Sequence, residues 1–246
     1  MNIVFSINVH EKIEFLKKQL DNIRDFVLSK YIVVLSCNQY MYEECNKTDF
    51  PPNIWINPEI IEKKRFHGSI TQGIYSNMKH VIQNQIDFHY FVILSSRNMF
   101  YKPMRENDLS GRQIWVQNPH AYQRLCKTQK TVTKDWHWKS FEQTNLARYF
   151  RKNGYALYSS QHEGVVFHKT VCLNIIWFLD SKPGIRDHLF QYNNCVEEFA
   201  LQTIAVNCIH PKKREIGFFN IGRGWDLEVQ PIKSSKNSFV YLTERN

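Results

Sequence analysis

The chain opens with a regular alternation of apolar runs and amphipathic stretches. Four short apolar runs predict strands that are buried on both faces, at residues 3–9, 31–36, 53–56 and 88–94. Two longer stretches carry apolar residues at helical spacing, at residues 11–28 and 69–82. The order strand, helix, strand, strand, helix, strand predicts an α/β fold with a mostly parallel, doubly wound sheet at its core.

The pattern is less regular after residue 104. Helical spacing recurs in three stretches, at residues 140–153, 170–179 and 195–206. Short strand-like runs lie between and after them, at residues 114–116, 164–168, 217–221, 227–229 and 239–242. We therefore expect a mixed or antiparallel C-terminal part. No Pro/Ser-rich linker or internal repeat divides the chain, so we expect one domain over residues 1–246.

The composition is that of a globular protein. The 246 residues are 43% hydrophobic and 22% charged, both ordinary values. None of the six cysteines forms a Cys-x-x-Cys pair, and this spacing argues against a zinc site. The first strand begins almost at the N-terminus with no signal-peptide pattern before it, and no stretch is long enough to span a bilayer. We expect a soluble, cytoplasmic protein.

The formal net charge of +9 favours anionic partners. The basic residues are scattered, and they cluster only at residues 63–65 and 212–214. A merely soluble basic surface would look the same, whereas a groove that follows nucleic acid needs a continuous basic stripe. The charge therefore favours polyanions, anionic membrane surfaces or phosphorylated small molecules, and because the basic residues are scattered we expect no nucleic acid as a partner.

Polar residues follow the first and fourth predicted strands. In open α/β sheets ligands bind beyond the carboxyl ends of the strands, and right-handed crossovers bring these two ends to one rim. We expect five residues to gather round one crevice there: His10, Glu11, Ser95, Ser96 and Arg97. The first turn contains no glycine and the chain has no Walker loop, which sets aside Rossmann dehydrogenases and P-loop enzymes.

The strand at residues 88–94 ends without a metal motif. A metal-dependent sugar-nucleotide enzyme would carry Asp-x-Asp there, but the chain has Arg97 and Asn98, and the next carboxylate is Glu106. If this rim binds a nucleotide sugar, a group other than a metal must neutralise the phosphates.

Two adjacent acids, Glu197 and Glu198, open the predicted helix at residues 195–206. Adjacent side chains on a helix point about 100° apart, so only one of the two easily faces a cleft. A carboxylate near a helix N-terminus is stabilised in its ionised form, as a general base requires. Acids that merely complement the helix dipole would give the same pattern.

Two further segments carry groups suited to a sugar. Glu163 and Gly164 stand immediately before the predicted strand at 164–168, and a glycine there lets a ligand approach closely. Trp136 and Trp138 are able to stack on a sugar face. Exposed loop residues and ordinary aromatic packing remain the alternatives for these two pairs.

Together these segments resemble the core-2/I-branching type of GT-A glycosyltransferase, whose members work without Asp-x-Asp. The turn at residues 7–11 is similar to the family's first nucleotide-binding turn, and residues 91–102 are similar to its apolar strand and small polar pair. Residues 163–167 resemble the segment that leads to the acceptor side, and residues 197–204 resemble the acidic-pair helix. The resemblance implies a GT-A-like, Rossmann-like fold.

The resemblance also implies roles for individual residues. It makes Glu198 the general base, with Glu197 beside it. It implies a nucleotide- and diphosphate-binding set of Val9, His10, Glu11, Ser95, Ser96, Arg97, Arg214 and Arg245. It implies an acceptor-binding set of Trp136, Trp138, Glu163 and Gly164. Residues 1–104 would form the nucleotide-binding half, and residues 105–246 the acceptor-binding and catalytic half.

The reaction that this resemblance implies is a single displacement with inversion. A sugar would pass from a nucleotide-sugar donor, which we expect to be UDP-linked, to a hydroxyl of a glycan or glycoprotein. Arginine and lysine would take the place of a metal, so no cofactor and neither Mn nor Mg is expected. Family members are typically membrane-anchored and disulfide-bonded, so this chain would be a compact, soluble microbial or viral relative.

Two alternatives stay open. A metal-dependent GT-A glycosyltransferase would use a lone acid or Asn98 as its metal ligand. A non-catalytic basic α/β module would bind nucleic acid or an anionic glycan. The donor sugar, the acceptor and the oligomeric state are also open at this stage.

Overall fold

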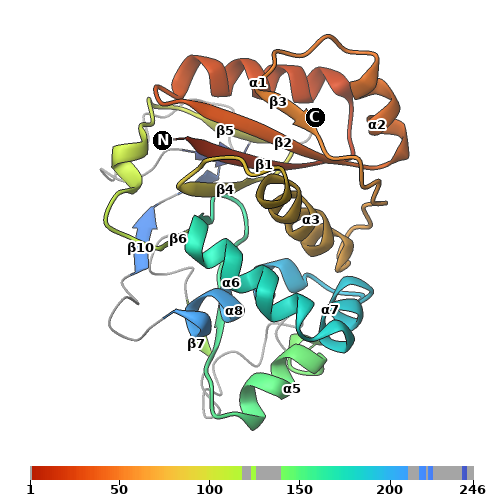
Figure 1. The fold of residues 1–246 in the computed structure, drawn as a ribbon, viewed down its shortest axis with the longest axis vertical. Helices are drawn as coiled ribbons and strands as arrows, with labels where there is room; N and C mark the ends of the chain where they lie inside the picture. The colour runs from red at the N-terminus through yellow and green to blue at the C-terminus, as the bar shows by residue number, and fades with distance from the viewer. Residues whose placement is uncertain are drawn as a thin grey trace.

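The computed structural model describes residues 2–117, 123–125, 140–209, 216–219, 221–223 and 240–242. Its main sheet has the strand order β10-β6-β9-β4-β1-β2-β3 (Figure 1). The strands are β1 (Ile3–Val9), β2 (Tyr31–Cys37), β3 (Ile54–Ile56), β4 (Tyr90–Leu94), β6 (Ile114–Gln117), β9 (Val166–His168) and β10 (Ile216–Phe219). The protein is therefore an α/β protein with a mixed, mostly parallel sheet, as the sequence pattern predicts.

One strand of this sheet, β9, runs opposite to the others. The pairs β1–β2, β1–β4 and β2–β3 are parallel, which confirms the parallel arrangement predicted for the first half. β9 lies between β4 and β6 and is antiparallel to both, whereas β6 and β10 are parallel to each other. All strands except β9 therefore point the same way, and their carboxyl ends share one edge, which we call the carboxyl rim.

Helices cover both faces of the sheet. They are α1 (Ile13–Phe26), α2 (Gln39–Asn46), α3 (Ser69–Gln83), α5 (Asn145–Lys152), α6 (Lys169–Asp180), α7 (Pro183–Phe190) and α8 (Ala200–Cys208). Phe5 and Ile7 of β1 pack with α1 and α2 on one face. Val4 belongs to a second core with α3, α6 and α8 on the other face. Figure 1 shows the two layers on opposite sides of the central strands.

Smaller elements complete the described structure. They are the 3-10 helices η1 (Glu106–Leu109) and η3 (Val196–Glu198) and the strands β5 (Asn98–Phe100), β7 (Gln123–Leu125), β8 (Leu157–Ser159), β11 (Ile221–Arg223) and β12 (Val240–Leu242). β12 pairs antiparallel with β5, and Leu242 is opposite Asn98. The backbone near the end of the chain therefore lies beside the segment that follows β4.

Three predicted elements differ from the observed ones. The helix expected over 195–206 is broken, because Phe199 leaves helical geometry (φ −127°, ψ −44°) and its ring stacks on Phe141 with a centroid distance of 4.9 Å. The helix expected over 140–153 begins only at Asn145, because Thr144 is its N-cap. The strand expected from Gly164 begins at Val166, because Gly164 has a left-handed backbone (φ +77°). The strand expected at 227–229 lies outside the described residues.

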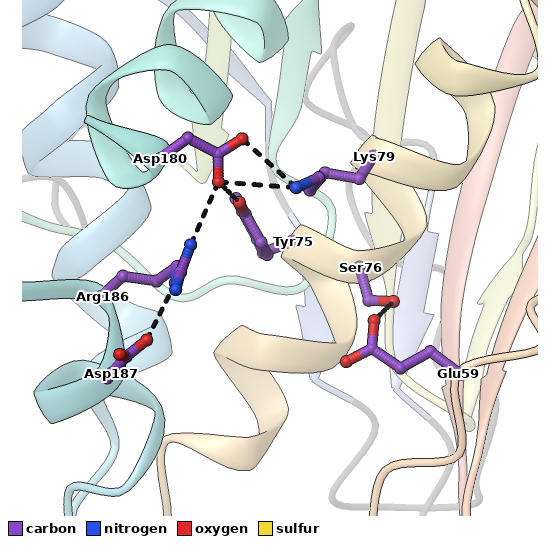
Figure 2. A network of polar contacts seen from close by, with 7 residues as sticks. All are labelled: Glu59, Tyr75, Ser76, Lys79, Asp180, Arg186 and Asp187. Atoms are coloured by element: carbon purple, nitrogen blue, oxygen red, sulfur yellow. Dashed lines mark hydrogen bonds and ion pairs between the residues drawn. The ribbon is translucent and has the colours of Figure 1, made fainter. Parts of the chain in front are cut away.

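A polar network joins α3 to α6 and α7 on the outer side of the second core. Asp180 at the end of α6 accepts a hydrogen bond from the Tyr75 hydroxyl and contacts Lys79 at 3.2 Å and Arg186 at 3.3 Å (Figure 2). Burial opposes ionisation of Asp180, but the hydrogen bonds from Tyr75 and Lys79 outweigh it and lower the pKa of this carboxyl. In the same view, Ser76 of α3 donates to Glu59. The network fixes α3, whose N-terminus lies at the carboxyl rim.

Across the described ranges, none of the helices has both the length and the apolar composition needed to cross a membrane.

Candidate active site

The turn after β4 is held by amide side chains. Asn98 accepts a hydrogen bond from the Ser95 backbone N–H at 2.6 Å. Gln19 of α1 donates to the carbonyl oxygens of Ser95 and Asn98, at 2.7 and 2.9 Å. Asn98 and Gln19 are fully buried, and Ser96 is nearly so. These contacts fix the Ser95–Asn98 turn, and the complete burial of the Asn98 side chain makes it a poor candidate for a metal ligand.

Arg97 and Glu11 form an ion pair across the rim. The arginine Nε and Nη2 lie 2.8 and 2.7 Å from Glu11 Oε2, and the guanidinium lies over the Phe15 ring at 5.1 Å from its centroid. The structure thus brings together two residues that the sequence predicted at one crevice.

Two other predicted residues of this rim differ in exposure. His10 is exposed, whereas the Val9 side chain is in the core. The Val9 carbonyl oxygen accepts from the Asn38 N–H at 3.3 Å.

The loop before β9 lies beside the end of β4. The Gly164 N–H donates to the Ile93 carbonyl oxygen at 2.6 Å, and the Ile93 N–H donates to the Val165 carbonyl oxygen at 2.9 Å. The positive φ of Gly164 permits this close turn without a side-chain clash. The loop therefore places His162 and Glu163 at the carboxyl rim, next to the Ser95 turn. His162 Nδ1 lies 3.5 Å from Glu163 Oε2, and neither atom has a hydrogen-bond partner among the described residues.

The two acids of η3 lie in different surroundings. Glu197 is only 3% exposed, and its Oε2 has no hydrogen-bond partner in the described part of the chain. Burial, together with a smaller contribution from the nearby charge of Glu163, raises the pKa of Glu197 to about 8. Glu198 is partly exposed, and its backbone carbonyl accepts from the Ser160 N–H at 2.9 Å. Glu197 is thus mostly protonated at neutral pH, while Glu198 has access to water.

Glu163 is close enough to Glu197 to interact with it electrostatically, and Glu198 follows Glu197 in the chain; we call these three residues the acidic cluster. The cluster joins two segments that are more than thirty residues apart in the sequence. Gln202 of α8 donates to the Ser160 carbonyl at 3.2 Å and ties α8 to the same loop. A carboxyl group whose pKa is raised by burial, as at Glu197, is a feature of sites that carry out acid or base chemistry.

A partly buried lysine, which the sequence analysis named only as part of a basic run, has its amino group at the end of β2. Lys63 Nζ donates to Ser36 Oγ at 3.0 Å and to the Ile61 carbonyl at 2.9 Å. Burial lowers its pKa to about 8. A Cβ at Gly73 of α3 would lie 2.1 Å from Asn8 Oδ1 and 2.9 Å from Ser36 Oγ, so only glycine fits between them. The basic run at 63–65 was the available sequence signal, but it does not distinguish a partly buried lysine from exposed ones.

Four residues of the predicted site lie outside the described residues: Trp136, Trp138, Arg214 and Arg245. Their neighbours in sequence are informative. Leu242, three positions before Arg245, is opposite Asn98 at the carboxyl rim. Ile216, two positions after Arg214, is opposite Ile114 at the other edge of the sheet, because β10 and β6 run in the same direction as β4. The described end of β12 therefore lies at the carboxyl rim, whereas the described start of β10 lies at the opposite edge of the sheet.

Within the described ranges, no group of three or more His, Cys, Asp and Glu side chains is placed to hold a metal ion. Comparison of the sequence with protein-family models gives no match, and comparison with curated proteins gives none either. The function of the protein is therefore inferred from the residues of the carboxyl rim alone.

Proposed function

We propose that this protein is an inverting glycosyltransferase that moves a sugar from a UDP-linked donor to a glycan hydroxyl. The observation that carries the proposal is the acidic cluster at the carboxyl rim. It combines a buried, largely protonated Glu197 with a water-accessible Glu198, beside the turn that follows β4. Ligands of α/β sheets bind at this edge, and a base there is positioned to act on them.

In the proposed reaction, Glu198 takes the proton from the acceptor hydroxyl as its oxygen attacks the anomeric carbon. The bond between this carbon and the nucleoside diphosphate breaks, and the diphosphate leaves with the electron pair. Glu197 stays mostly neutral at pH 7 and donates a hydrogen bond, because burial, with a smaller contribution from the charge of Glu163, raises its pKa to about 8. Glu163, at the neighbouring loop, contacts the acceptor.

Donor binding is assigned to the β1 and β4 ends of the rim. Ser95 and Ser96 supply polar contacts, and the Glu11–Arg97 pair closes the crevice at its side. Arg245 and Lys63 are the cations proposed for the diphosphate, since β12 approaches the Ser95 turn and Lys63 Nζ lies at the end of β2. Such cations stabilise the charge that develops on a leaving phosphate. The role of Arg214 stays a prediction.

A metal-dependent transferase is the closest alternative. It would need an oxygen ligand near the end of β4, but the Asn98 side chain there is fully buried. The net charge of +9 is the observation that favours a second candidate, a non-catalytic basic module. Such a module would bind nucleic acid or anionic glycan with a steep salt dependence and would leave every nucleotide sugar intact.

A thermal-shift screen of nucleotide sugars, with manganese or with excess chelator, tests the proposal. A ligand that binds only the folded state raises the melting temperature. We expect a UDP-sugar to stabilise the protein equally under both conditions and to be consumed when an acceptor is added. Stabilisation that requires manganese would support the metal-dependent alternative. No stabilisation by any nucleotide sugar, with salt-sensitive binding of DNA or heparin, would support the binding module.

A further inference from the structure

A pocket of about 440 Å³ opens at the end of α7, and none of its lining residues belongs to the carboxyl rim as described above. It is lined by Ser140, His188, Gln191, Tyr192 and Asn193. Its volume lies within the range of pockets that hold small molecules. It also stands close in sequence to η3, since Asn193 is four positions before Glu197.

Among the described residues, the pocket lining is polar, aromatic and uncharged. Burial lowers the pKa of His188, and the charge of Arg148 lowers it further, so the imidazole is neutral at pH 7. A neutral imidazole offers one donor and one acceptor. His188 Nδ1 is buried and has no hydrogen-bond partner among the described residues. Together with two amides, a hydroxyl and the Tyr192 ring, this lining suits an uncharged ligand that carries several hydroxyl groups.

The Tyr192 side of the pocket is held in place before any ligand binds. The Tyr192 hydroxyl donates to the Ser140 carbonyl at 2.8 Å, and its ring centroid lies 5.2 Å from that of His188. The Tyr192 carbonyl accepts from the Gly68 N–H at 2.8 Å. A Cβ at Gly68 would lie 1.9 Å from the Leu189 carbonyl oxygen, so glycine is needed for this contact. Because these residues are already ordered in the folded protein, a ligand that binds them loses less conformational entropy than one that has to order a mobile surface.

The chain connects this wall to the acidic pair by a short, compact route. The Asn194 N–H donates to the Tyr192 carbonyl at 3.0 Å, and the Val196 N–H donates to the Asn194 carbonyl at 2.8 Å. Both are three-residue turns, which shorten the path. Even a fully extended chain of this length spans at most about 18 Å. One short oligosaccharide is therefore long enough to reach from the pocket to Glu198.

We propose that this pocket binds a neutral sugar unit of the acceptor glycan, away from the hydroxyl that receives the transferred sugar. The role of this sugar as part of an acceptor rests on the proposed function, but the binding of a saccharide in the pocket does not depend on catalysis. The pocket would then select the acceptor by a unit that takes no part in the reaction.

The experiment measures binding of chitotriose, cellotriose and maltotriose to the full chain by NMR titration, without nucleotide. We expect one of these neutral trisaccharides to bind and to shift the resonances of His188 and Tyr192. Replacing the exposed Asn193 with alanine should weaken binding about 3- to 10-fold, as the loss of one or two hydrogen bonds predicts. The matched control is Asn46→Ala, an exposed asparagine at the end of α2, which should leave affinity unchanged.

The outcomes separate this inference from the proposed function. Binding that weakens in Asn193→Ala but not in Asn46→Ala supports the pocket, and it does so even if no nucleotide sugar is ever consumed. If the protein transfers sugar and Asn193→Ala raises the acceptor KM with kcat unchanged, both proposals are supported. If transfer occurs with the same acceptor KM in both variants, or if no trisaccharide shifts the His188 and Tyr192 resonances, the pocket inference is wrong.

Discussion

The two sides of the carboxyl rim treat their charged groups in opposite ways. On the β1 side, Glu11 and Arg97 neutralise each other, and Gln19 and Asn98 bind the backbone of the turn. On the β9 side, Glu163 Oε2 and Glu197 Oε2 are buried and have no hydrogen-bond partner among the described residues. Buried polar atoms without a partner also occur on the β1 side, at Gln19 Oε1 and Asn98 Nδ2, so the difference lies in the charged groups. The comparison teaches that the β1 side is a frame whose charges are paired, whereas the chemistry that we propose falls to the carboxyl groups of the β9 side.

The largest effect on stability should come from the pH dependence of Glu197. Its pKa is raised from an ordinary value near 4.5 to about 8 in the folded protein. A raised carboxyl pKa means that the folded state binds the proton more tightly than the unfolded state. The stability from this group is therefore complete only below about pH 4.5, and it is lost progressively as the pH rises from there through 8. We expect the free energy of unfolding to fall by about 4 kcal/mol between pH 5 and pH 9 from this group alone.

Urea unfolding of wild type and Glu197→Gln at pH 5, 7 and 9 measures this effect. Because glutamine stays uncharged, the variant should show a flatter pH dependence and should exceed the wild type in stability at pH 9. Glu14→Gln, at an exposed position of α1, is the matched control and should follow the wild type. Parallel pH curves for wild type and Glu197→Gln would show that this carboxyl is not held in a buried, unpaired state.

On the β1 side, we expect a substitution to lower the stability of the protein, not to raise it. Asn98→Ala removes the acceptor for the Ser95 N–H from a fully buried position. It should destabilise the protein by about 2–3 kcal/mol at pH 7, because the N–H is left unsatisfied and a small cavity forms. Asn107→Ala, at an exposed position of η1, should change stability by less than about 0.5 kcal/mol. Equal urea midpoints for the two variants would contradict the claim that Asn98 belongs to a structural frame on the β1 side.

Local patterns in the sequence predicted much of the fold. The buried runs gave β1, β2 and β4, and the helical stripes gave α1 and α3, because each of these elements buries a long apolar surface. α2 was missed, since only Met41 and Cys45 of its eight residues are buried. The antiparallel insertion of β9 between β4 and β6 was also missed, because pairing between distant segments leaves no local signal.

The site was predicted in part for the same reason. Polar residues after strands are visible in sequence, so the meeting of Glu11 with Arg97 was accessible. The unequal burial of Glu197 and Glu198 depends on the break at Phe199, which is imposed by its packing on Phe141. Lys63 is partly buried by tertiary contacts with Ser36 and Ile61, which no composition or spacing rule contains.

The most direct test of the account compares Glu198→Gln with Glu197→Gln in a single-turnover transfer assay, with donor affinity measured separately. If Glu198 is the general base, its replacement should slow transfer by about 10²- to 10⁴-fold while the donor Kd stays the same. Glu197→Gln mimics the protonated form of a neighbouring acid and should stay within about tenfold of the wild type. Retained transfer in Glu198→Gln, or loss of transfer in Glu197→Gln alone, would contradict the assignment.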